Sequence, residues 1–232
     1  MKRFIALCLI GATVVTVAAC SKAESASAPA GPIKMLYLKR GEGTNDPYVV
    51  KHFEKKGYTV IDMADNVFKS ENVKGYNVVY VSPTVNSSRI DAQLKQSAVP
   101  VVYAKPQVAG ISQLTGLLDY NELSAAKTVQ IKDSKHPLAA GLKDQVAVYK
   151  NEGKIGYALP GKEATTIATV PGDDKKAVVF GYEKGVKNLG NEPVPARQVF
   201  FYLSAGEEMN QTDDGFKLLD AAIEWAAKNG SK

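Results

Sequence analysis

Polar side chains that could bind a small molecule follow three predicted strands, in the loops where those strands end. The loops cover residues 40–46, 82–89 and 105–107. Parallel sheets flanked by helices bind ligands beyond the carboxyl ends of their strands, so we expect these loops to converge. Their hydroxyl, amide and charged groups could hold a sugar or another small polar metabolite; the alternative is a solvated rim of loops and helix caps. The candidate residues are Arg40, Glu42, Asn45, Asp46, Ser82, Asn86, Ser87, Arg89, Lys105 and Gln107.

Histidine is the side chain best suited to acid–base catalysis near neutral pH, and the chain contains two. His136 joins the candidate residues as a possible general base or ligand; the alternative is a turn residue that packs before Pro137. His52 lies beside apolar positions of a predicted helix and is expected at the surface of the domain. Neither histidine belongs to an H-x-H or H-E-x-x-H pattern, so the sequence predicts no metal site and no cofactor.

The amino-terminal residues resemble the signal of a bacterial lipoprotein. Lys2 and Arg3 precede an apolar run at 4–17, which is shorter than the roughly 20 residues that a membrane-spanning helix needs. The run ends in Val-Ala-Ala-Cys, which resembles the lipobox, where a peptidase cuts before a cysteine that already carries lipid. This resemblance implies a signal peptide at 1–19 and acylation of Cys20, with palmitate among the fatty acids. An ordinary signal peptide with an incidental cysteine is the alternative.

The same resemblance implies a location in the cell envelope, where the lipid on Cys20 would attach the protein to a membrane. Ser21 follows the predicted acylation site. In Gram-negative families, an aspartate at that position retains lipoproteins at the inner membrane. The outer membrane is therefore the expected location if the cell is Gram-negative.

Composition excludes several classes of function for the mature chain. The only cysteines are Cys8 and Cys20, so cleavage and acylation would leave no thiol nucleophile, no disulfide and no cysteine metal ligand. The full chain has 29 Lys and Arg and 24 Asp and Glu. Loss of Lys2 and Arg3 leaves 27 basic residues and a net charge of +3. The basic residues are scattered, and the sequence predicts no nucleic-acid binding.

Residues 20–32 are predicted to form a flexible tether, and residues 33–232 a single α/β domain. The tether is small, polar and proline-containing. Asp46 is the predicted N-cap of the first helix and Ser88 that of the second. Strands and helices alternate and the strands are continuous apolar runs, which predicts a doubly wound, mostly parallel sheet with helices on both faces. Strands are predicted at 33–38, 58–63, 76–81 and 99–104, and helices at 46–56 and 89–96.

The second half of the chain has a different pattern, with short strands separated by Gly and Pro turns. We expect some of these strands to be antiparallel additions or edge strands of the sheet. A helix at 213–228 closes the chain, because apolar residues recur at helical spacing from Phe216 to Ala226. The short strands are predicted at 128–132, 146–149, 154–158, 165–170, 177–181 and 197–203.

Several of these segments resemble the class I glutamine amidotransferase-like superfamily, which has a flavodoxin-like sheet. The nearer resemblance is to the non-amidotransferase branch that includes the ThuA-like proteins of trehalose utilisation. The similar segments are YNVVYVS at 76–82, VPVV at 99–102, HPLAAGL at 136–142, RQVFF at 197–201 and AIEWA at 222–226. The resemblance spans roughly residues 33–227.

One departure from the superfamily bears directly on activity. In active amidotransferases a cysteine occupies the tight turn after the strand that corresponds to 101–104, and a His–Glu pair activates it. The turn in this chain reads Ala-Lys-Pro-Gln at 104–107, without Cys, Ser or Thr. Glutamine hydrolysis by that route needs an activated nucleophile beside a base. The resemblance therefore implies a catalytically degenerate domain, and we predict no catalytic residues.

The sequence is compatible with three hypotheses about function. The first, which we favour, is a tethered domain that binds a small polar ligand or a protein partner in the envelope. The second is a ThuA-like enzyme of sugar metabolism without a cysteine nucleophile, in which Glu42 or Asp46 would act with His136. The third is a structural accessory subunit of an envelope complex, which would expose an apolar patch and lack a polar pocket.

Overall fold

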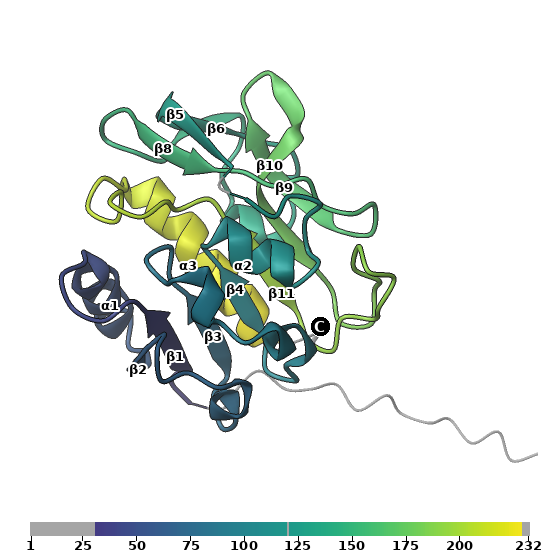
Figure 1. The fold of residues 1–232 in the computed structure, drawn as a ribbon. Helices are drawn as coiled ribbons and strands as arrows, with labels where there is room; N and C mark the ends of the chain where they lie inside the picture. Colours follow the sequence, from purple (N-terminus) through teal and green to yellow (C-terminus); the bar gives the residue numbers. More distant parts are fainter. Residues whose placement is uncertain (1–30, 120, 229–232) are drawn as a thin grey trace, which may run out of the picture.

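One mixed sheet organises the chain, as Figure 1 shows. The protein is described by a computed structural model that covers residues 31–119 and 121–228. Among these residues, nine strands pair in the order β2-β1-β3-β4-β11-β10-β9-β6-β7. The predicted signal peptide and Cys20 lie outside the described residues. Within them, no helix has the length and apolar character needed to cross a bilayer.

The half of the sheet that starts at β2 is parallel, and its central strands are buried on both faces. Its members are β1 (Lys34–Lys39), β2 (Thr59–Ala64), β3 (Val78–Val81), β4 (Val101–Tyr103) and β11 (Gln198–Phe201). Every residue of β3 and β4 is buried, which explains why these strands are continuous apolar runs in the sequence. The first four were predicted to within two residues at each end.

The other half is antiparallel, as predicted for the carboxyl-terminal part of the chain. It contains β6 (Thr128–Ile131), β7 (Gln145–Ala147), β9 (Thr165–Val170) and β10 (Asp173–Tyr182). A separate antiparallel pair joins β5 (Glu122–Ala126) to β8 (Gly153–Gly156). The prediction of a doubly wound α/β sheet with antiparallel additions is confirmed.

Helical segments cover both faces of the parallel half and create two hydrophobic cores. On one face, α1 (Asp46–Lys55) and α3 (Asp213–Ala227) pack on Met35 and Tyr37 of β1. On the other face, α2 (Pro106–Ile111) and the 3₁₀ turns η1 (Ser70–Val73) and η3 (Ala92–Gln96) contribute to the core with Leu36 and Leu38. Successive residues of β1 thus point to opposite faces. A further 3₁₀ turn, η4 (Pro137–Ala139), packs against α3.

The predicted helix at 89–96 is wrong. Two 3₁₀ turns replace it: η2 (Ser87–Arg89), capped by the side chain of Asn86, and η3, capped by the side chain of Asp91. Between them Ile90 adopts an extended conformation (φ −84°, ψ 121°) and is buried. Ser88, the predicted cap, instead donates its hydroxyl hydrogen bond to the Asn86 side chain at 2.9 Å. Local capping by Asn86 and Asp91 therefore prevails over the helical spacing of the segment.

Candidate functional site

The carboxyl ends of β1 and β3 form a topological switch point. After β1 the chain continues to β2 on one side of β1, and after β2 it crosses to β3 on the other side. β1 is paired with β2 on one side and with β3 on the other. The loop after β1 and the loop after β3 meet there, and the Arg40 backbone N–H donates to Thr84 Oγ1 at 3.1 Å. The carboxyl end of β11 lies at the same edge of the sheet because β11 is parallel to β4. This is the position where sheets of this kind bind ligands.

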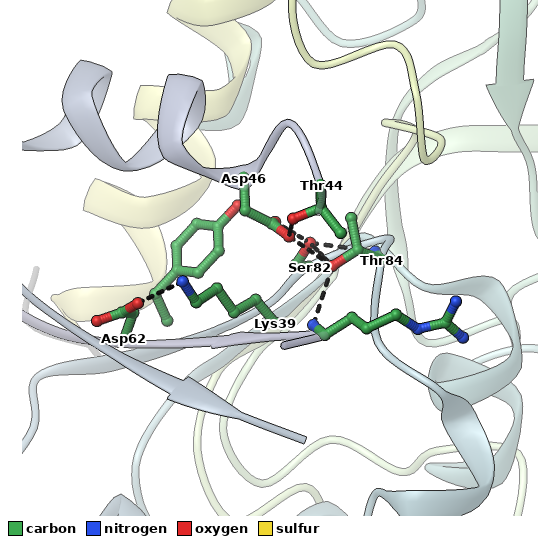
Figure 2. A network of polar contacts seen from close by, with 8 residues as sticks. Lys39, Thr44, Asp46, Asp62, Ser82 and Thr84 are labelled. Carbon is green, nitrogen blue, oxygen red and sulfur yellow. Dashed lines mark hydrogen bonds and ion pairs between the residues drawn. The ribbon is translucent and has the colours of Figure 1, made fainter. Parts of the chain in front are cut away.

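A buried carboxylate holds the two loops together, and Figure 2 shows its surroundings. Asp46 is fully buried. Its Oδ1 accepts hydrogen bonds from Tyr37 Oη at 2.8 Å and Ser82 Oγ at 2.5 Å. Its Oδ2 accepts from Thr44 Oγ1 and Thr84 Oγ1, each at 2.6 Å. Residues from three separate segments thus donate to one carboxylate.

These contacts correct the predicted role of Asp46. Asn45 is the N-cap residue of α1, and Asp46 is the first helical residue; no side chain caps this helix. A carboxylate offers about four acceptor positions, and four hydroxyl groups occupy them. Burial raises the pKa of Tyr37 well above its usual value, so the phenol stays protonated and can donate. Asp46 therefore has no acceptor position left for a substrate proton and serves to join the loops.

A cavity of about 320 Å³ borders this network, because Thr44 and Thr84 belong to both. Its lining includes Arg40, Thr44 and Asn45 from the loop after β1, Thr84 from the loop after β3, and Gly206 and Glu208 from the loop after β11. Arg40 and Asn45 are two of the predicted site residues. The lining combines a cation, a carboxyl group, an amide and hydroxyl groups, a mixture that suits a small polar ligand.

Glu208 is the member of this cavity with the most unusual environment. It is fully buried, and its Oε2 accepts a hydrogen bond from the Gly206 backbone N–H at 2.9 Å. Its Oε1 has no hydrogen-bond partner among the described residues. Burial is the largest cause that raises the pKa of Glu208, and the negative charge of Asp46 raises it further. Backbone N–H groups and the Asn45 side chain partly oppose this shift.

Other buried polar atoms at this edge of the sheet also lack partners within the described residues. They are Tyr80 Oη in β3, Gln107 Oε1 in α2 and Ser204 Oγ in the segment after β11. Buried polar groups are nearly always hydrogen-bonded, to protein, water or ligand. Among the described residues, Glu208 Oε1 is the unpaired buried atom that belongs to the lining of the cavity itself.

Three of the predicted residues, Asn86, Ser87 and Arg89, do not line the cavity, and two of them contact another carboxylate. The Asn86 backbone N–H donates to Asp65 Oδ2 at 2.7 Å, and Arg89 Nη1 donates to Asp65 Oδ1 at 3.1 Å. Ser87 belongs to the same turn, η2. Asp65 follows β2 and is 1% exposed, so these contacts anchor the 82–89 loop to the loop after β2.

The third predicted loop, residues 105–107, contacts the loop after β3 and does not line the cavity. Lys105 is buried, and its Nζ donates to the Pro83 carbonyl at 3.0 Å, which steadies the loop that carries Ser82 and Thr84. Gln107 is buried in α2, and Glu42 is exposed in the loop after β1. At the turn after β4, Lys105 has a relaxed extended backbone (φ −114°, ψ 106°).

The structure does not bring His136 to the candidate site. Its Nδ1 accepts a hydrogen bond from the Leu138 backbone N–H at 3.2 Å, which makes it the cap of η4. Its ring lies 5.5 Å from the ring of Trp225, and the Arg197 guanidinium covers the same Trp225 at 4.2 Å. Arg197 immediately precedes β11, so this cluster lies at the amino ends of the strands. The predicted pairing of His136 with Glu42 or Asp46 is therefore wrong.

The other histidine and the acidic residues give no evidence of a metal centre. His52 Nε2 contacts Asp220 Oδ1 at 2.7 Å on α3. Within residues 31–119 and 121–228, no group of three or more His, Cys, Asp or Glu side chains is arranged to hold a metal ion.

Comparison with known proteins places this geometry in a fold family. No protein-family profile matches the chain, and no curated protein matches it in sequence. Among solved structures, a Thermoplasma acidophilum protein named for one of the subunits of GMP synthase is 12% identical, with 84% of this chain and 94% of that chain covered and a TM-score of 0.56. A ThuA-like protein from Parabacteroides merdae is 14% identical, with 84% and 90% covered and a TM-score of 0.51. The chain has the glutamine amidotransferase-like fold.

The amidotransferase-like fold confirms the resemblance seen in the sequence at the level of architecture. TM-scores of 0.56 and 0.51 at identities of 12% and 14% support the fold alone, so activity has to be argued from the site itself. Thr44, Thr84, Gly206 and Glu208 were absent from the predicted set. The two threonines lie in or beside the predicted loops. Glu208 could have been found by placing 197–203 parallel to 99–104, which puts the following loop at the same edge.

The raised pKa of Glu208 predicts a pH-dependent stability that one substitution removes. The folded chain binds the Glu208 proton more tightly than the unfolded chain, whose carboxyl group has a pKa near 4.5. This group therefore stabilises the fold increasingly as pH falls from the folded pKa toward 4.5, and the contribution is lost as pH rises through that window. We expect Glu208→Gln to be more stable than wild type at neutral pH and to show a flatter profile in this window.

Urea denaturation between about pH 4 and pH 8 measures this effect. Glu152→Gln is the control because Glu152 is exposed, and its profile should follow that of wild type. A Glu208→Gln variant that is less stable at neutral pH and keeps the wild-type profile would contradict the assignment.

Proposed function

We propose that this protein is a lipid-anchored envelope lipoprotein whose amidotransferase-like domain binds a small polar, sugar-like ligand and does not hydrolyse glutamine. The observation that supports ligand binding is the cavity at the switch point. Arg40 offers donors at its rim, and Glu208 has a buried oxygen without a partner among the described residues.

The chemistry of the lining favours a compound with several hydroxyl groups. Glu208 Oε1 can accept a hydrogen bond from a ligand hydroxyl, and Arg40 and Asn45 can donate to ligand oxygens. Thr44 already donates to Asp46, so its oxygen can accept from a ligand. Thr84 Oγ1 donates to Asp46 and already accepts from the Arg40 backbone N–H. A volume of about 320 Å³ is near the lower end of ligand pockets, which run from about 300 to 1,000 Å³. This size suits a single sugar ring or a comparable metabolite.

The loss of glutamine hydrolysis rests on the turn after β4. The residue there is Lys105, whose ammonium group is committed to the Pro83 carbonyl. The turn offers no hydroxyl or thiol, and Asp46, one of the acids considered for catalysis, has its acceptor positions filled. His136, the only histidine proposed as a base, lies at the other edge of the sheet.

Thermal denaturation in the presence of sugars, amino acids, nucleotides and divalent metals tests the proposal, followed by calorimetry of the best ligand. Binding to the native state raises the melting temperature. We expect a saturable shift with sugar-like compounds. Arg40→Gln should weaken the affinity by about 10-fold or more, because hydrogen bonds to a charged group contribute about 1.5–3 kcal/mol.

Lys162→Gln is the control, since it removes the same charge from an exposed residue that does not line the cavity. It should leave the affinity unchanged. The absence of any shift across the panel, or an equal loss in Arg40→Gln and Lys162→Gln, would overturn the proposal in favour of a protein partner.

A further inference from the structure

A second pocket lies between α1 and α3, and it shares no lining residue with the cavity at the switch point. Its volume is about 290 Å³. Its main lining residues are Tyr48, Lys51, Lys55, Lys150, Gln211 and Phe216. The pocket therefore combines aromatic rings with three lysines.

The periodicity of α1 explains this composition. Tyr48, Lys51 and Lys55 stand at helical spacings of three, four and seven residues, so they share one face of the helix. Val49 and Phe53 lie on another side and are buried against the sheet. The face of α1 that carries the lysines therefore points toward α3 and solvent.

Positive charge in the pocket is only partly balanced. Lys51 and Lys55 are exposed and form no ion pair within the described residues, whereas Lys56 pairs with Asp220 at 3.1 Å. Lys150 Nζ donates to the Met209 carbonyl, which is neutral. Asp213 is the acidic residue of the lining. Three lysines against one carboxylate favour an anionic occupant.

Gln211 adds a buried donor to the same pocket. The residue is 1% exposed, and its Oε1 accepts from Tyr202 Oη at 3.2 Å. Its Nε2 has no partner among the described residues. A buried donor without an acceptor costs about 1–3 kcal/mol, and an anionic oxygen in the pocket would supply that acceptor.

Aromatic side chains form the apolar wall of the pocket. The Tyr48 ring is 5.9 Å from the Phe216 ring, and Tyr48 is 38% exposed. His52 stacks on Phe216 at 4.2 Å and covers part of it. Tyr48 is therefore the ring on which a flat group of a ligand could lie.

We propose that this α1–α3 pocket is a second ligand site, for a small molecule that carries a phosphate ester on a flat ring. A phosphate monoester has up to two negative charges and three acceptor oxygens, which match three ammonium groups and one amide donor better than a single carboxylate does. Lysine is a common phosphate ligand. Tyr48 and Phe216 would contact the ring. This site is independent of the ligand proposed for the switch point.

Calorimetric titration of the protein with phenyl phosphate, inorganic phosphate and phenol tests this site. Because both the charge and the ring contribute, phenyl phosphate should bind about 10-fold or more tightly than either fragment. The double variant Lys51→Gln/Lys55→Gln should weaken phenyl phosphate binding by about 10-fold or more. In an NMR spectrum, the side-chain amide of Gln211 should shift on binding.

The matched control is Lys162→Gln/Lys175→Gln, which removes the same charge from two exposed lysines elsewhere. It should bind phenyl phosphate as wild type does, and so should Arg40→Gln. Equal weakening in the two lysine double variants would reduce the effect to general charge and overturn the proposal. Inorganic phosphate binding as tightly as phenyl phosphate, or no binding of phenyl phosphate, would also overturn it. Since Arg40→Gln tests only the first cavity, the two proposals can fail separately.

Discussion

Replacing Asp46 with alanine is expected to lower the free energy of unfolding by about 3 kcal/mol, because several buried hydroxyl groups would lose their acceptor. Asp46 is fully buried and accepts four hydroxyl hydrogen bonds. Without the carboxylate, the hydroxyl groups of Tyr37, Ser82 and Thr84 remain buried with fewer acceptors. Each buried unpaired polar group costs about 1–3 kcal/mol, and relaxation of the loops recovers part of that cost.

Chemical denaturation measures this change. Asp46→Asn should cost less than Asp46→Ala, because the amide keeps one oxygen as an acceptor. Asp174→Ala is the control: its side chain is 70% exposed in an ion pair with Lys132, and such pairs contribute about 0–1 kcal/mol. An Asp46→Ala variant as stable as Asp174→Ala would show that the network does not hold the loops.

Replacing Cys20 with serine is expected to move most of the protein from the membrane fraction to the soluble fraction. The reason is the loss of the acyl chains, each of which contributes about 0.8 kcal/mol per buried CH₂ group. The measurement combines cell fractionation with incorporation of a labelled palmitate analogue. Cys20 lies outside the described residues, so this prediction rests on the lipobox-like segment alone.

Cys8→Ser provides the matched control, since Cys8 is the only other cysteine and stands within the predicted signal peptide. It should keep both the label and the membrane location. Retention of the label in Cys20→Ser, or its loss in Cys8→Ser, would contradict acylation at Cys20.

Much of the fold could be predicted from local patterns. The apolar runs that became β1, β3 and β4 were recognised because strands buried on both faces have little polar interruption. The closing helix was also recognised, and α3 spans Asp213–Ala227. Of the antiparallel pair β5–β8, the sequence predicted a strand near β8, at 154–158, and none at β5. Residues 122–126 have an irregular pattern, with a register shift between Leu123 and Ala126.

The candidate site was predicted less completely than the fold. Arg40 and Asn45 line the cavity. Asn86 and Arg89 instead donate hydrogen bonds to Asp65, and the His136 side chain caps the 3₁₀ turn η4 at the opposite edge of the sheet. Proximity in sequence to a strand end places a residue at the correct edge of the sheet. It does not determine the direction of the side chain, which depends on neighbours from other loops.

The sequence by itself determined the alternation of strands and helices, the parallel core and the absence of a nucleophile after β4, because these follow from local periodicity and residue identity. Only the tertiary structure decided that Asp46 would bind hydroxyl groups 36 and 38 positions away, and that Glu208 would line the same cavity as Arg40. The reason is physical: hydrogen bonds and burial act between groups that chain topology brings together. The parallel position of β11 next to β4, a long-range pairing, is what carries the Glu208 loop to the site.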